Sequence, residues 1–203
     1  MEFQQCLSLL AARPPHSHED CENRANSTPL DVKEATSKTS FASEPAEDLL
    51  RLSPRQLIQA VFQLQEMRVL IYTDFREGFQ AHQKTQQFPT FCSEITIRFS
   101  NVSEQIKCIE KLLRDKMQQV SIAKLLRNLQ SEEKNKLLLT SAVMVEKMRL
   151  SDAANIPEPD DSSVAFLQRS VETLTSKHTE CVVRINEILE DLRAENADLE
   201  DVC

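Results

Sequence analysis

The hydrophobic positions of this chain recur at three- and four-residue intervals over long stretches, and this spacing places side chains along one face of a helix. The first such stretch follows Ser53-Pro54. Serine at the N-cap, proline at the first helical position and Gln56 three residues after the serine predict a helix start with a capping box. The predicted apolar face contains Leu57, Val61, Leu64, Ile71, Phe75 and Phe79.

Two further helices are predicted between Phe88-Pro89 and about residue 150. The first of these shows an unbroken alternation of three- and four-residue steps through Cys92, Ile95, Phe99, Val102, Ile106, Ile109 and Leu113. The next begins at Gln118 or Ser121 and carries Ile122, Leu125, Leu126, Leu129, Leu137, Thr140, Val143 and Met144. The join at residues 115–120 contains neither proline nor glycine, so the pattern leaves open whether these two helices are continuous.

The longest apolar repeat covers residues 163–203 and follows a predicted linker over residues 151–162, which contains Pro157 and Pro159. The repeat persists for five heptads, so we expect an acidic coiled-coil helix. The pattern leaves open whether this seam packs on the rest of the chain, on a second copy or on another protein. Its expected partner-binding positions are Val171, Leu174, His178, Ile185, Ile188 and Leu192.

Composition favours a helical fold for the body of the chain. There is one glycine, Gly78, no tryptophan and one tyrosine, whereas Leu, Gln, Glu, Lys and Arg dominate after residue 48. The lone glycine suggests a helix end or a close approach of the backbone to another group. Residues 1–48 are rich in polar residues and proline, which predicts a disordered arm. We expect an all-α protein, with a helical hairpin or bundle over residues 53–150 and a C-terminal coiled-coil helix.

Charge is unevenly distributed along the chain. Residues 53–150 carry 15 basic and 10 acidic side chains, whereas residues 151–203 carry 4 basic and 13 acidic ones. A basic group in the middle of the chain is a candidate for contact with nucleic-acid phosphates, although a solvated face or a dock for the acidic tail fits the same pattern. The candidate phosphate-contacting residues are Lys107, Lys111, Arg114, Lys124 and Arg127.

The sequence contains no recognisable catalytic or cofactor motif. A chain with one glycine has no glycine-rich phosphate loop and no glycine-flanked nucleophile elbow. The six cysteines lack Cys-x-x-Cys spacing, and His16 and His18 lie in the predicted arm, where no core would hold a metal. We expect no enzyme, no cofactor, no metal and no small-molecule substrate. Without a secretory leader or a long apolar run, a nuclear or cytoplasmic protein with no membrane span is expected.

A dispersed set of residues in the middle of the chain carries a family resemblance. It consists of Leu64-Gln65, Arg68, Tyr72, Phe75, Glu77-Gly78-Phe79, Ile95, Phe99, the Ser103 to Ile109 helix, Leu129-Gln130, Glu133-Lys134 and Lys136-Leu137. Over roughly residues 57–149 the chain resembles the required-for-excision-one B-domain family. The resemblance implies a helical domain with a role in DNA repair and brings no catalytic residues. The residues expected to define the fold are Leu64, Tyr72, Phe75, Gly78, Phe79, Ile95, Phe99, Ile106 and Leu129.

These observations favour a non-catalytic adaptor that binds protein partners through helical seams, and the resemblance implies that it takes part in DNA excision repair. One alternative is a structural coiled-coil subunit of a cytoskeletal or trafficking assembly, which the long acidic coil would suit. A weaker alternative is direct DNA binding through the Lys107 to Arg127 face, which predicts an affinity that falls as salt rises.

Overall fold

The computed structural model describes residues 49–199, which form four α-helices after one short 3-10 turn, with no strand among them. The all-α prediction is therefore confirmed. The predicted disordered arm, residues 1–48, and the last residues of the chain lie outside the described range. The elements are η1 (Leu49–Arg51), α2 (Pro54–His82), α3 (Phe88–Asp115), α4 (Val120–Ala154) and α5 (Asp161–Asp198).

The start of α2 confirms the predicted capping box. The Ser53 hydroxyl accepts a hydrogen bond from the Gln56 backbone N–H at 3.3 Å, and the Gln56 side-chain oxygen accepts one from the Ser53 N–H at 2.9 Å. Two N–H groups that the first helical turn leaves without partners are satisfied in this way. Pro54 occupies the first helical position, where its lack of an N–H costs nothing.

The helices on either side of residues 116–119 are separate, which answers the question that the sequence left open. α3 ends at Asp115 and α4 begins at Val120. Between them Gln118 adopts a left-handed conformation with φ of 58°, and the Gln119 N–H donates to the Leu113 carbonyl at 2.8 Å. This left-handed helix ending usually uses glycine. Here a glutamine adopts it, so composition alone did not reveal the break.

The linker before α5 is shorter than predicted. α4 continues through residues 151–154, which the sequence assigned to the linker. The Asn155 side-chain amide donates to the Ser151 carbonyl at 2.8 Å and so satisfies one of the free carbonyls of the last turn. Asp160 then caps α5 by accepting from the Ser162 and Ser163 N–H groups.

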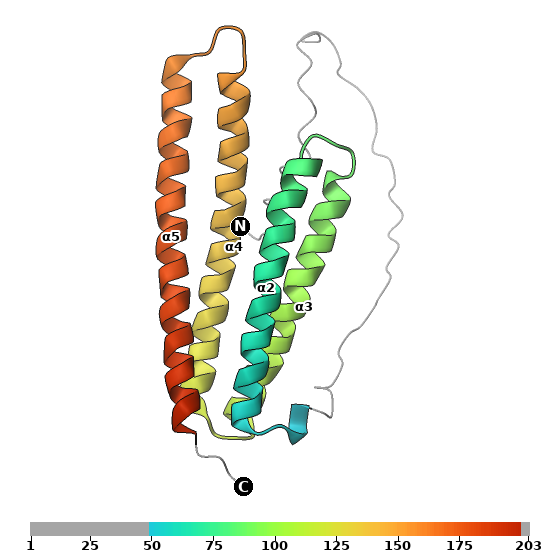
Figure 1. The fold of residues 1–203 in the computed structure, drawn as a ribbon, viewed down its shortest axis with the longest axis vertical. Coiled ribbons are helices and arrows are strands. Elements are labelled where there is room, and N and C mark those ends of the chain that lie inside the picture. Colours follow the sequence, from blue (N-terminus) through green and yellow to red (C-terminus); the bar gives the residue numbers. More distant parts are fainter. Residues whose placement is uncertain (1–48, 200–203) are drawn as a thin grey trace, which may run out of the picture.

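The helices form two antiparallel hairpins, α2/α3 and α4/α5, that lie side by side (Figure 1). α4 packs against α3 and along α5, whereas α2 and α5 touch little. The α4/α5 hairpin is the longer of the two and extends past the closed end of α2/α3 (Figure 1). One hydrophobic core joins all four helices, and in it α5 contributes Cys181, Ile185 and Leu192.

Gly78 lies inside α2, and the helix continues one more turn to His82, so this glycine does not end it. Its role is close approach, because a Cβ built at Gly78 would lie 2.2 Å from Cε2 of Phe91 on α3. The Phe91 ring has little freedom to move away. It packs against the rings of Phe75, His82 and Phe88 at centroid distances of 5.3 to 6.5 Å.

We expect Gly78→Ala to destabilise the protein. Alanine favours a helix over glycine by about 1 kcal/mol, but forcing a methyl group into packed rings costs about 1–3 kcal/mol. Urea unfolding followed by far-UV circular dichroism measures the balance. In the Phe91→Leu background the loss should shrink or reverse, because the aromatic ring is gone. Greater stability of Gly78→Ala in the parent chain would contradict the steric argument.

Candidate functional site

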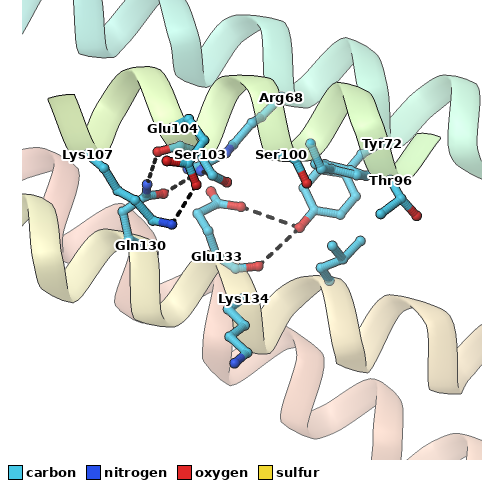
Figure 2. Close-up of a pocket in the computed structure, with 12 residues that line it drawn as sticks. Arg68, Tyr72, Thr96, Ser100, Ser103, Glu104, Lys107, Gln130, Glu133 and Lys134 are labelled. Carbon is cyan, nitrogen blue, oxygen red and sulfur yellow. Dashed lines mark hydrogen bonds and ion pairs between the residues drawn. The ribbon is translucent and has the colours of Figure 1, made fainter. Parts of the chain in front are cut away.

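A cluster of polar side chains lies inside the otherwise apolar junction of α2, α3 and α4 (Figure 2). We call it the polar junction. Burying a polar group costs free energy unless the group is hydrogen-bonded, so these side chains need hydrogen-bond partners inside the bundle. The members are Gln65, Arg68, Tyr72, Ser103, Gln130, Glu133 and Lys136.

Arg68 connects the three helices. Its side chain is on the buried face of α2 and only 3% of the residue is exposed. The guanidinium donates to Gln65 Oε1 at 3.0 Å, to Ser103 Oγ on α3 at 3.0 Å and to Gln130 Oε1 on α4. Gln130 in turn donates to the Ser103 carbonyl at 2.8 Å. Burial lowers the pKa of Arg68 while the nearby Glu133 charge acts to raise it.

Glu133 supplies the negative charge of the junction and is 6% exposed. It accepts from the Gln65 side-chain amide at 3.3 Å, and the Lys136 ammonium lies 3.7 Å from its other oxygen. The Tyr72 hydroxyl lies 3.4 Å from both the side-chain and the backbone oxygen of Glu133. Burial, and then the charge of Glu133, raise the pKa of Tyr72, so its hydroxyl stays protonated and donates. Lys136 also lies 4.2 Å from the centre of the Tyr72 ring, in cation–π geometry.

A groove of about 430 Å³ lies over the polar junction between α3 and α4. Figure 2 shows Tyr72 directed toward Glu133 at its floor, with Ser100 and Ser103 on the α3 side. Lys107 and Glu104 at its edge form an ion pair of 2.7 Å. Most polar side chains that line this groove therefore already have a hydrogen-bond or ion-pair partner. The arrangement holds three helices at a defined register, since the hydrogen bonds from Arg68 to Ser103 and Gln130 cross from α2 to α3 and α4.

Sequence reasoning did not single out these residues as a site, although all of them carried the family resemblance. Gln65, Arg68 and Tyr72 share the buried face of α2 with Leu64 and Ile71. The available signal was a polar residue at a position where the helical repeat predicts an apolar one. The repeat itself could not show which polar residues meet, because their partners on other helices are 27 to 68 residues away.

The predicted partner-binding seam of α5 faces α4 of the same chain. Ile185 and Leu192 are buried there, while Val171, Leu174, His178 and Ile188 are half-buried. His178 Nε2 lies 3.1 Å from Thr140 Oγ1. The Thr140 hydroxyl donates to the Lys136 carbonyl at 2.7 Å, so the histidine nitrogen must be the donor to threonine. Packing on the chain itself is therefore the alternative that the structure adopts.

The predicted phosphate-contacting residues lie on α3 and α4, and acidic neighbours partly neutralise them. Three of the five form ion pairs, which are Lys107 with Glu104 at 2.7 Å, Arg114 with Glu110 at 2.9 Å and Arg127 with Glu110 at 2.6 Å. Lys111 and Lys124 are exposed. Local pairing of this kind is what a solvated helical face shows. Nucleic-acid contact stays a prediction.

Within residues 49–199 no group of His, Cys, Asp and Glu side chains is arranged to hold a metal ion, and His16 and His18 lie outside that range. None of the described helices is long and apolar enough to cross a membrane.

Replacement of Arg68 by methionine should destabilise the protein by about 2–4 kcal/mol. It leaves the acceptors of Gln65, Ser103 and Gln130 without their donor. It also removes the favourable charge interaction of Arg68 with Glu133, which then has only Lys136 as a nearby cation. The control is Arg76→Met on the exposed face of the same helix, which should change stability by less than about 0.5 kcal/mol. Equal effects of the two substitutions in urea unfolding would show that the junction is not stabilising.

His178 should make stability depend on pH. Burial lowers its pKa from 6.5, and the charges of Lys136 and Arg76 lower it further. The unfolded chain therefore takes up this proton at higher pH than the folded chain, so stability is lost as pH falls below about 6.5. Urea midpoints between about pH 7.5 and 5.5 should fall less steeply in His178→Gln, which can still donate to Thr140. Parallel pH profiles for the two proteins would contradict this assignment.

Residues 56–147, just under half of the chain, match the family model described as DNA repair REX1-B. The match confirms the resemblance and includes α3, nearly all of α2, most of α4 and every residue of the polar junction. No curated protein and no solved structure gives a significant match to the chain. Over residues 56–147, the chain is therefore similar to the DNA repair REX1-B family.

Proposed function

We propose that the chain is a non-catalytic adaptor that acts in DNA repair, in the nucleus, by binding protein partners. The family description supports the repair role. The observation that supports the adaptor role is that the polar groups of the polar junction are already hydrogen-bonded. Its arginine, amide and hydroxyl groups bond to one another across three helices, which suits a rigid scaffold.

The two alternative functions receive less support. A coiled-coil subunit would offer the α5 seam to another molecule, but Cys181, Ile185 and Leu192 are already buried within this chain. Direct DNA binding would need uncompensated cations on α3 and α4. Glu104 and Glu110 pair with Lys107, Arg114 and Arg127, which weakens that surface as a phosphate contact.

The repair role predicts that cells without the gene lose viability after ultraviolet irradiation and that the full-length chain restores it. Colony survival after graded doses measures this. Normal survival of the deleted cells would contradict the repair role. In cells that express the tagged full-length chain, affinity purification before and after irradiation should recover repair or chromatin proteins. Recovery of a fixed set of cytoskeletal subunits that does not change with damage would favour the structural alternative.

The non-catalytic role predicts that Tyr72→Phe restores survival as well as the parent chain. The substitution removes a 3.4 Å hydrogen bond, worth about 1 kcal/mol, and keeps the ring. Ile71→Val, a neighbouring buried change that costs about 0.5–1.5 kcal/mol, controls for lost stability. If Tyr72→Phe fails at normal protein levels while Ile71→Val succeeds, the hydroxyl has a chemical role and the adaptor proposal is wrong.

A further inference from the structure

A second groove, of about 410 Å³, lies on the other side of α4, where α2, α4 and α5 meet. We call it the α2/α4/α5 groove. α2 ends at His82, whereas α4 continues to Ala154 beside α5, so the longer hairpin has no α2 to cover it beyond this level (Figure 1). The groove therefore arises from the unequal lengths of the two hairpins.

The floor of this groove is apolar and adaptable. Phe79 from α2 and Val143, Met144 and Met148 from α4 line it. Phe79 is buried, but the three α4 side chains are only half-buried because no helix packs over them here. Methionine side chains are flexible and polarisable, and they are common on surfaces that accept apolar side chains of varied shape.

The rim of the groove is positively charged. Arg76 on α2 and Lys147 on α4 are both exposed, and the groove lining contains no acidic residue. Neither cation forms an ion pair in the described part of the chain, and Arg76 only donates to the Thr73 hydroxyl at 3.4 Å. Lys107, Arg114 and Arg127, in contrast, each have a carboxylate partner. On a chain of net charge -8, two cations without a carboxylate partner beside an apolar floor favour an anionic, partly apolar ligand.

We propose that the α2/α4/α5 groove binds an acidic, amphipathic segment of a protein partner, an inference that rests on the adaptor function proposed above. One or two large apolar side chains of the segment lie on Met144 and Met148, and its carboxylates pair with Arg76 and Lys147. The volume of about 410 Å³ suits a few side chains rather than a whole helix. This is the usual division of a peptide interface into apolar anchors and a charged rim.

The test is selection of random peptides displayed on phage against the full-length chain. The recovered peptides should combine Asp or Glu with Leu, Phe or Met. The strongest of them is then synthesised with a fluorescent label and titrated. Its affinity should fall at least about tenfold in the double variant Arg76→Glu, Lys147→Glu, since both attractive charges become repulsive. Recovery of basic or uncharged peptides, or an unchanged affinity in the variant, overturns the proposal.

The control is the double variant Lys111→Glu, Lys124→Glu, which makes the same change in net charge at two exposed lysines outside the groove. Its affinity for the peptide should stay within about twofold of the parent if the attraction is local rather than general. An equal loss in both variants means that net charge, not the groove, governs binding, and it overturns the proposal. Circular dichroism spectra identical to that of the parent show that each variant is folded.

A photo-reactive amino acid at Gln83, which lines the groove, identifies the occupant directly. In the full-length chain it should form a covalent adduct with the selected peptide. The adduct could instead form with residues 1–48 of the same chain, even in the presence of excess peptide. That result identifies this chain's own N-terminal segment as the occupant and overturns the proposal.

Purification from irradiated cells separates failure of this inference from failure of the adaptor function. If the parent chain recovers repair proteins and the Arg76→Glu, Lys147→Glu variant loses them, the groove is their docking site. Equal recovery by both overturns the groove and leaves the adaptor function in place. If the parent chain recovers no partner at all, the adaptor function fails, and with it a protein occupant for the groove.

Discussion

The buried guanidinium of Arg68 is the interaction on which the relative positions of α2, α3 and α4 depend. Moving a charged group out of water carries a large free-energy cost, which hydrogen bonds must offset. Its acceptors come from Gln65 on α2, Ser103 on α3 and Gln130 on α4. A sliding movement of any one helix would leave this donor or its acceptors unpaired. Apolar packing alone tolerates such shifts more readily, so the junction makes one register far more favourable than its neighbours.

A fixed register between the hairpins has consequences beyond the junction. α4 contacts α3 of the other hairpin through Gln130. It contacts α5 of its own hairpin through Glu132, which forms an ion pair of 3.0 Å with Arg184. The Cys181 thiol also lies 3.3 Å from the Glu132 carbonyl, and burial raises its pKa to about 11, so it is a packing group rather than a reactive thiolate. The position of α4 against α3 therefore determines where the free end of the longer hairpin projects.

Much of this fold follows from local sequence. The capping box at Ser53 and Gln56 and the three- and four-residue apolar repeats predict the helices, because both depend on residues within one or two turns. The break between α3 and α4 was not predictable in the same way, since Gln118 adopts a conformation that normally indicates glycine. The polar junction was even harder to predict from the sequence. Arg68 and Gln130 are 62 residues apart, and only the packing of the helices shows that they meet.

Segment charge was also an incomplete guide to function. The basic middle of the chain suggested a phosphate-binding face from Lys107 to Arg127, yet most of those cations are paired with carboxylates one helical turn away or on the adjacent helix. The cations without a carboxylate partner in the described range include Arg76 and Lys147, which are far apart in sequence and lie at the rim of one groove. A ligand responds to the local field rather than to the segment total, because charges more than about 10 Å away are largely screened at physiological salt. The surface of this chain best suited to an acidic partner is therefore set by which cations the fold leaves without a carboxylate.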